Sequence, residues 1–209
     1  MRISRGQLIA GAISLAPLAM LIVNYFLDNL TANPVQAASL LTGRTAMVLL
    51  ILSLACTPLR NLLGLTSLFK IRKTLGVVAF LYAFLHFLIY AGLAFEFNLL
   101  WIVERVRTVP FILIGLIALL LLIPLAVTSF NKIQKKMGKN WQSLHRLVYP
   151  IAILAIIHYR MAIKGDPTRP VVYAVVLLLL LLLRIPPFKN IQIALKNKWL
   201  ISINDFLLH

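Results

Sequence analysis

The sequence has few of the residues on which most catalytic sites depend. It contains one cysteine, Cys56, in 209 residues, which excludes a disulfide framework and a thiolate metal cluster. None of its nine glycines forms a Gly-x-Gly pair, so the chain lacks the glycine-rich turn of dinucleotide-binding folds. With five acidic residues, no His-Glu-x-x-His motif and no Ser/His/Asp grouping, the sequence offers no acid–base or nucleophilic centre. We therefore expect no catalytic residues in this chain.

Apolar residues dominate what is present. Hydrophobic residues make up 61% of the chain, charged residues 12%, and the mean hydropathy is +0.95, which is typical of integral membrane proteins. Six apolar runs are each close to the roughly 20 residues needed to cross a bilayer. The sequence therefore predicts an all-α, polytopic membrane protein, a six-transmembrane-helix bundle forming one domain over residues 1–209. The expected spans are about 8–27, 43–59, 74–95, 109–128, 146–164 and 170–185.

The first and last spans differ from the other four. The first run is followed by Gln36-Ala37-Ala38, which has the small residues of a signal-peptidase site. Its length exceeds the roughly 7–15 residues of a signal core, so we expect it to be retained as a span. The last run is short, and we expect the flanking Arg169 and Arg184 to snorkel to the two interfaces.

The cations predict the orientation. Fifteen of the 21 Lys and Arg residues fall on the N-terminus, the loops 2–3 and 4–5 and the C-terminal tail, which the positive-inside rule assigns to the cytoplasm. Four of the five acids, Asp28, Glu96, Glu104 and Asp166, fall on the other side. Both termini are therefore expected in the cytoplasm. The net charge is +16. Because cation-rich loops alternate with loops that carry few cations, this charge indicates membrane orientation and contact with anionic lipid rather than nucleic-acid binding.

Two histidines are expected at the same depth in the bilayer. His86 follows Lys73 by 13 residues and His158 follows Arg146 by 12, which places them roughly 20 Å and 18 Å along parallel spans. A lone histidine at this depth could simply bond across helices, but a matched pair is typical of a bis-histidine haem b. Small residues on the same helical faces would leave room for the porphyrin: Ala79, Ala83, Ala152 and Ala155. We therefore predict that His86 and His158 bind haem iron.

His145 lies at the cytoplasmic boundary, 13 residues before His158. No histidine occupies the corresponding place in span 3, where Arg72 and Lys73 stand. Three interpretations stay open. His145 is a ligand of a second haem with an unusual or missing partner ligand, or a solvated interfacial residue. In the third, His145 and the cations Arg72, Lys73, Lys139 and Arg146 hold an anionic inner cofactor such as a flavin phosphate, haem propionates or a quinone head group.

Several segments resemble a known family. They are Thr42-Gly43-Arg44-Thr45-Ala46, Thr57-Pro58-Leu59, Arg72-Lys73-Thr74-Leu75-Gly76, Leu85-His86, Ile157-His158-Tyr159 and the block from Gly138 to Tyr149. Together they are similar to the MsrQ family, the haem-binding membrane subunits of the bacterial periplasmic protein-methionine-sulfoxide reductase system. The match runs from about residue 40 to 185, and Trp-Gln-Ser-Leu-His at 141–145 is its most specific part. This family lies in the ferric-reductase-like transmembrane group with NADPH oxidases and STEAP reductases.

The resemblance implies that His86, His145 and His158 are the haem-site histidines. It also implies that electrons pass from quinol or a flavin reductase, with FMN as a further cofactor, to the periplasmic molybdopterin subunit MsrP. The expected location is the bacterial inner membrane, and the chain is an electron-transfer subunit without a substrate-reducing site of its own. NADPH oxidases carry two histidines on each ligand helix, and this chain departs from that pattern by lacking the inner one on span 3.

Two other functions fit parts of the sequence. A b-type cytochrome serving another reductase would share every one of these residues. A transporter with His86 and His158 as a proton relay would predict internal repeats and interrupted helices. The sequence shows no internal repeat, while Pro17, Pro124 and Pro150 are points where spans 1, 4 and 5 could be interrupted.

The outer loops carry charges of both signs, and we expect this surface to dock the electron-accepting partner. The residues concerned are Glu96, Glu104, Arg105, Arg107, Arg160, Lys164, Asp166 and Arg169.

Overall fold

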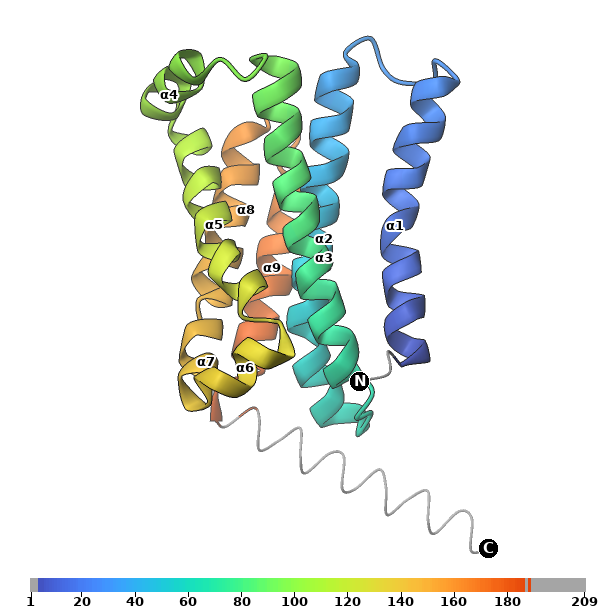
Figure 1. Cartoon of the computed structure of the whole chain (residues 1–209), viewed down its shortest axis with the longest axis vertical. Helices are drawn as coiled ribbons and strands as arrows, with labels where there is room; N and C mark the ends of the chain where they lie inside the picture. The colour runs from blue at the N-terminus through green and yellow to red at the C-terminus, as the bar shows by residue number, and fades with distance from the viewer. Residues whose placement is uncertain (1–3, 187, 189–209) are drawn as a thin grey trace, which may run out of the picture.

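The computed structural model describes residues 4–186 and 188, and within these residues the regular structure is entirely helical. Six long helices run alongside one another (Figure 1). They are α1 (Arg5–Phe26), α2 (Pro34–Leu63), α3 (Leu68–Ile89), α5 (Pro110–Val127), α8 (Val148–Ala162) and α9 (Thr168–Leu182). Four shorter elements complete the described chain: η1 (Tyr90–Ala94), α4 (Leu99–Thr108), α6 (Asn131–Met137) and α7 (Lys139–His145).

In residues 4–186 and 188, four helices are long and apolar enough to cross a membrane: α1, α2, α3 with η1, and α5. Helices α8 and α9 have 15 residues each and run beside them in the bundle (Figure 1). The expected all-α, polytopic membrane architecture is therefore confirmed. The count of six spans and the cytoplasmic placement of the termini stay predictions.

Helix α2 begins nine residues earlier than the hydropathy run indicated. The Asn33 side chain accepts a hydrogen bond of 3.0 Å from the Gln36 amide, and Pro34 occupies the first turn, a combination that favours helix initiation. The helix ends 30 residues later at Gly64, whose φ of 73° supplies the left-handed cap. This extension places Gln36 and Ser39 on the helix.

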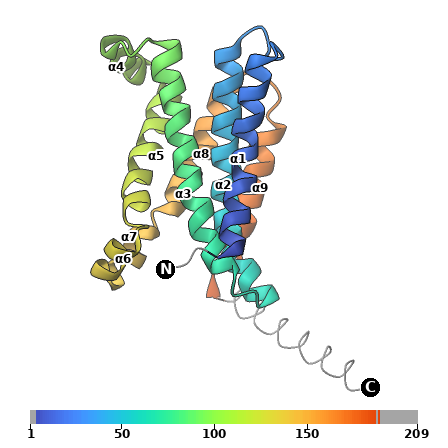
Figure 2. The ribbon, with the colours of Figure 1, turned by 45° about the vertical axis from the view of Figure 1, so that its right-hand side comes forward.

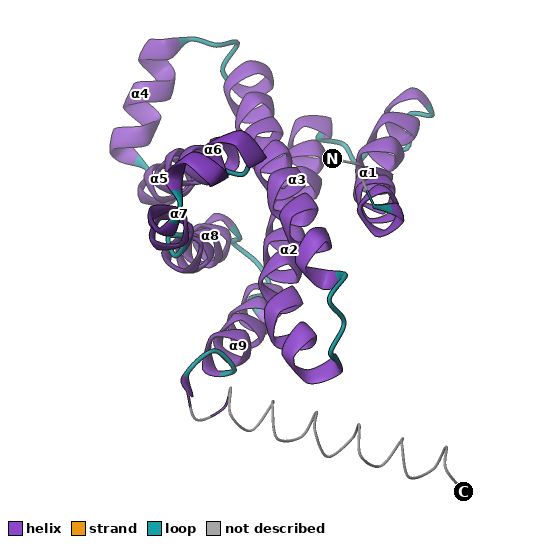
Figure 3. Cartoon of the chain, turned by 60° about the horizontal axis from the view of Figure 1, so that its bottom comes forward, coloured by secondary structure: helices purple, strands orange, loops and turns teal. Residues whose placement is uncertain are grey.

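The bundle is built around two antiparallel hairpins, α2 with α3 and α5 with α8 (Figure 3). Helix α1 lies outside them against α3 and α2, and α9 packs against α8 and α2 (Figures 2 and 3). The most buried side chains include Leu54, Ala79, Ile151 and Ala152, which are at most 1% exposed. The two helices of each hairpin pack tightly against each other. A ligand site is therefore expected between the two hairpins, where helices of a bundle face one another.

The prolines within helices do not interrupt them. Helices α1 and α5 continue through Pro17 and Pro124, and Pro150 lies in the first turn of α8. At the kink-prone part of α1, the Tyr82 hydroxyl of α3 donates to the Ser14 carbonyl at 2.7 Å and accepts from the Leu18 amide at 3.2 Å. Tyr82 thus bridges the backbone of α1 and ties this peripheral helix to the bundle.

Arg184 does not snorkel outward as the sequence analysis expected. Its guanidinium turns into the bundle, donates to the Tyr149 hydroxyl at 2.9 Å and to the Leu54 carbonyl, and lies 5.3 Å from the centroid of the Tyr149 ring. Pro58 explains the difference, because it cannot donate to the carbonyl four residues before it. The Leu54 carbonyl therefore has no donor within its own helix, and Arg184 supplies one. Arg169 is exposed, as expected.

The two ends of the bundle differ. Helices α6 and α7, the turn between α2 and α3, and the start of α1 lie at one end (Figure 1). We name this the basic end, after Lys70, Lys132, Lys135, Lys136 and Lys139. Helix α4 lies at the opposite end, which we name the α4 end (Figure 1).

Candidate functional site

His86 and His158 come together between the two hairpins. Their ring centroids are 6.0 Å apart and the ring planes are 81° to one another. Both rings line a cavity of about 320 Å³ to which α2, α3, α4, α5 and α8 contribute residues, a volume within the range of small-molecule sites. The structure therefore brings together the two histidines that the depth argument had paired.

Each of these rings is oriented by a backbone carbonyl. His86 Nδ1 lies 2.9 Å from the Ser39 oxygen on α2, and His158 Nδ1 lies 2.7 Å from the Phe111 oxygen on α5. A carbonyl oxygen can only accept, so Nδ1 carries the proton in both rings and Nε2 keeps its lone pair. Within the described residues, neither Nε2 has a hydrogen-bond partner. Both histidines are therefore in the tautomer that binds a metal through Nε2.

A glycine backs each ring. A methyl group added to Gly43 would lie 3.2 Å from His86 Nδ1, and one added to Gly115 would lie 2.7 Å from His158 Nδ1. A side chain at Gly115 would require the His158 ring to move, and one at Gly43 would crowd His86. Neither glycine stood out in the sequence, because glycine is frequent in membrane helices.

The two halves of the site repeat one another. Each acceptor carbonyl lies 47 residues before its histidine, and Phe111, Gly115 and His158 follow Ser39, Gly43 and His86 by the same 72 positions. The sequence shows no internal repeat, but the contacts of this site recur at a spacing of 72 residues. Since α2–α3 and α5–α8 run in the same direction (Figure 1), the repeat is parallel, and a ligand between the hairpins meets both halves in the same way.

The walls of the cavity are mainly apolar. Ala79, Ala83 and Ala155 line it as expected, whereas Ala152 is fully buried in the helix core. Five polar residues that the sequence did not single out as site residues also line the cavity: Gln36, Ser39, Arg44, Tyr90 and Tyr159. Arg44 donates from Nε to the Tyr159 hydroxyl at 3.1 Å. The π-helical turn η1, which holds Tyr90, follows His86 within one turn, and such turns are frequent at functional sites.

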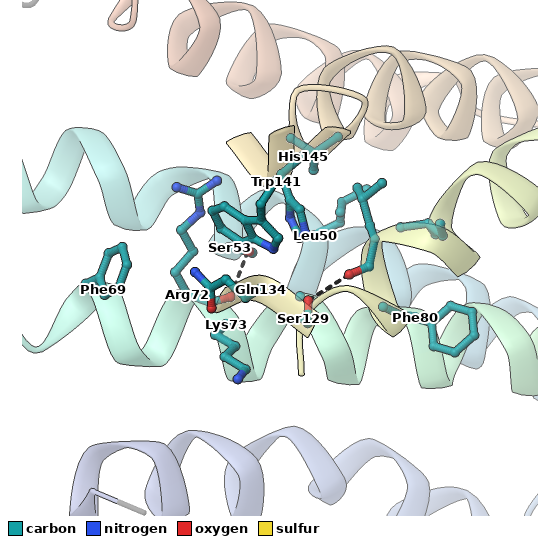
Figure 4. Close-up of a pocket in the computed structure, with 15 residues that line it drawn as sticks. Leu50, Ser53, Phe69, Arg72, Lys73, Phe80, Ser129, Gln134, Trp141 and His145 are labelled. Carbon is teal, nitrogen blue, oxygen red and sulfur yellow. Dashed lines mark hydrogen bonds between the residues drawn. The ribbon is translucent and has the colours of Figure 1, made fainter. Parts of the chain in front are cut away.

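A second cavity lies nearer the basic end, around His145 (Figure 4). It shares Leu50 and Leu122 with the first cavity, so these two leucines separate the sites along the bundle. Arg72 and Lys73 line it with His145, whereas Lys139 and Arg146 do not, and Arg146 is exposed. The structure thus brings together three of the residues expected around an inner cofactor.

The His145 ring is held differently from the other two. Its Nε2 lies 3.0 Å from the Thr128 hydroxyl, and that hydroxyl donates its proton to the Pro124 carbonyl at 2.6 Å. Nε2 must therefore donate to Thr128, which leaves the lone pair on Nδ1. The Trp141 ring stacks on His145 with centroids 4.0 Å apart and donates from Nε1 to the Thr128 carbonyl. Burial, with a smaller effect of Arg72, lowers the pKa of His145 to about 4, so the ring is neutral at pH 7.

The two cations of this second cavity are already hydrogen-bonded to neutral groups. Arg72 donates to the Thr57 hydroxyl at 3.2 Å and Lys73 to the Asn131 side chain at 2.7 Å. No acidic residue lines the cavity within the described chain. Its electrostatic character therefore favours an anion.

The residues around His86 and His158 fit a haem. No group of three or more His, Cys, Asp or Glu suitable for a bare metal ion occurs in the described residues, whereas protein zinc sites use three or four such ligands. Two axial imidazoles suffice for iron in a porphyrin, which supplies its own equatorial nitrogens. Metal–imidazole bonds of about 2 Å on both sides require ring centroids about 6 Å apart, and the observed value is 6.0 Å.

Known proteins are similar in sequence to this chain. The family described as ferric reductase like transmembrane component matches residues 42–156. A protein-methionine-sulfoxide reductase heme-binding subunit MsrQ from Rhodospirillum rubrum is 39% identical over 187 residues, which cover 87% of this chain and 88% of the relative. The proteins of the same name from Brucella ovis and Brucella canis are each 44% identical over 156 residues, or 75% of this chain and 70% of theirs. The chain therefore belongs to the ferric-reductase-like transmembrane family and, within it, to the MsrQ heme-binding subunits.

Proposed function

We propose that this protein is a membrane electron-transfer subunit that binds one haem b between His86 and His158. The observation that carries the proposal is the pair of Nδ1–carbonyl bonds, because they leave two free Nε2 lone pairs on rings 6.0 Å apart. A haem bound there supplies one-electron redox chemistry. The Ser39 and Phe111 carbonyls would orient the two imidazoles that hold the group, and the apolar walls would exclude water.

The proposed direction of electron flow, from the basic end to the α4 end, rests on the names of the relatives and on the distribution of charged residues. The matching proteins are named as subunits of a protein-methionine-sulfoxide reductase, which supports a periplasmic molybdopterin reductase, MsrP, as the acceptor at the α4 end. Quinol or a flavin reductase is the proposed donor at the basic end. FMN or another anionic cofactor is a candidate for the cavity of His145, Arg72 and Lys73. In this proposal, residues 1–209 form one ferric-reductase-like domain in a bacterial inner membrane.

A spectrum tests the haem site. We expect the dithionite-reduced minus oxidised difference spectrum of the purified protein to show a low-spin b-type haem, with His86→Ala and His158→Ala each removing it. Both variants should still insert, because apolar span length governs insertion. Tyr82→Phe is the matched control, since Tyr82 lies on α3 but bonds to α1 rather than to the cavity. Full six-coordinate haem retained by either alanine variant would overturn the proposal.

A second measurement tests the partner. Haem reduced by dithionite should be reoxidised by purified MsrP with its methionine sulfoxide substrate, and not by MsrP lacking molybdopterin. Reoxidation at the same rate with both preparations would show that the chain serves another reductase.

A further inference from the structure

The cavity around His86 and His158 is divided between polar and apolar residues. Toward the basic end its walls are apolar, with Met47, Leu50, Leu119, Leu122 and Ile151. Besides the two histidines, its polar side chains lie at the level of the histidines or nearer the α4 end, namely Gln36, Ser39, Arg44, Tyr90 and Tyr159. A ligand that fits this distribution has an apolar body and a polar edge directed toward the α4 end.

Tyr90 lacks a hydrogen-bond partner in this cavity. Its hydroxyl oxygen is buried, and no acceptor or donor reaches it in the described part of the chain. Tyr90 follows His86 by four residues, about 6 Å farther along the helix axis toward the α4 end. A buried hydroxyl without a partner is costly, so the group is suited to donate to a ligand.

Arg44 adds an uncompensated charge on the same cavity. Its Nε donates to the Tyr159 hydroxyl, but its terminal amino groups have no acceptor, and no carboxylate pairs with it, among the residues that the structure describes. A guanidinium has five donors and favours bidentate contact with a carboxylate. At the depth of the histidines a charge of this kind indicates an anionic partner.

We propose that Arg44 and Tyr90 bind the carboxylates of the haem, its two propionates, at the α4 end of the cavity. The inference rests on the proposed haem site and adds its orientation, because the carboxylate edge then faces α4 and the apolar edge faces Leu50 and Leu122. Ile102 and Val106 of α4 also line the cavity, so the carboxylate edge would lie beneath the helix nearest the proposed acceptor.

The test uses the haem-loaded protein in detergent and does not depend on activity. The variants are Tyr90→Phe, which removes only the hydroxyl, and Arg44→Gln. The tyrosine control is Tyr82→Phe on α3, the helix that η1 continues. Two quantities are measured: the rate of haem transfer to excess apomyoglobin and the resonance Raman bending bands of the propionates. We expect each variant to release haem about tenfold faster, since it loses a hydrogen bond to a charged group, and to shift the propionate bands. The control should match the wild type, and Arg44→Lys should recover part of the Arg44→Gln loss.

The outcomes separate the inference from the proposed function. Haem with an intact bis-histidine spectrum, but with release rates and propionate bands unchanged in Tyr90→Phe and Arg44→Gln, would overturn the inference alone. Absence of haem from the wild-type protein would overturn both. If Arg44→Gln prevents folding, the Tyr90→Phe result decides, because this variant keeps the ring and its contact with Phe95.

Discussion

Gly115 and His158 are in such close contact that one added methyl group could not fit between them. A Cβ atom at Gly115 would lie 2.7 Å from Nδ1 and 2.8 Å from Cε1 of the imidazole. The ring is held there by the Phe111 carbonyl on the same helix as Gly115. The backbone of α5 therefore fixes both the distance and the direction of this histidine.

Alanine at Gly115 should displace the His158 ring. Overpacking of this kind costs about 1–3 kcal/mol, and we expect Gly115→Ala to lower the haem content per chain and to change the g-values of the ferric haem in electron paramagnetic resonance. Gly43→Ala should have a smaller effect, because its Cβ would lie 3.2 Å from His86. The control is Gly11→Ala, whose nearest contact would be an ordinary 3.9 Å. Equal spectra in all three variants would show that the rings tolerate the added volume.

Replacing His145 with alanine should leave the proposed haem of His86 and His158 bound but slow its reduction. The roughly 20 Å of helix between Lys73 at the basic end and His86 is long for one fast electron transfer, and the cavity of His145 lies between. Stopped-flow reduction by a quinol analogue, with haem quantified per chain, measures the effect. Normal kinetics with a full haem complement would assign His145 to the interfacial role.

The low pKa of His145 predicts how stability depends on pH. The folded protein holds this pKa at about 4, against 6.5 for an ordinary histidine, so between these values the unfolded chain binds more protons than the folded chain. Stability should therefore fall as the pH is lowered from 7 to 5. His145→Gln should lose that part of the pH dependence, measured as the thermal midpoint in detergent at both pH values. Identical pH dependence in the two proteins would contradict a buried, neutral His145.

Reversing charge on α4 should slow electron transfer to the partner. Arg105 and Arg107 are exposed on the helix whose other face, through Ile102 and Val106, covers the cavity. Charges at such a surface mainly set encounter rate and orientation and are screened by salt. We expect the rate of transfer to purified MsrP to change with ionic strength and to fall in the Arg105→Glu, Arg107→Glu double variant, with an unchanged haem spectrum.

The control for this reversal is Lys135→Glu with Lys136→Glu, two exposed lysines at the basic end. A rate that ignores both salt and the α4 reversal would show that the acceptor docks elsewhere. A rate that falls equally in both double variants would point to net charge rather than to a docking surface.

Sequence reasoning paired His86 with His158 because a helix rises by a constant amount per residue, so depth follows from counting. It could not identify Ser39 or Phe111, because any residue can supply a backbone carbonyl. Gly43 and Gly115 could not be identified either, because each is required by contact with a histidine ring on another helix, which the sequence does not show. The 72-residue repeat rests on so few side chains that it is visible only in three dimensions.

Arg184 shows a second limit. A cation after an apolar run is expected at the interface, but the acceptor that draws it inward is a carbonyl of α2 freed by Pro58, more than a hundred residues earlier. Helices α4, α6 and α7 lie outside the apolar runs, so hydropathy could not reveal them. Their caps and short lengths depend on local contacts.

The parallel repeat of the two hairpins makes the two sides of the site alike except at the positions where the halves differ. If the halves were identical, both faces of a bound haem would meet the same surroundings. Arg44 stands where the second half has Leu116, and Lys73 stands where it has His145. Arg44 therefore places a positive charge on one side of the haem plane only. In the second cavity, His145 gives one wall a neutral base and Lys73 gives the other an ammonium group. A ligand between the hairpins can therefore tell its two faces apart through these few positions, within an otherwise two-fold frame.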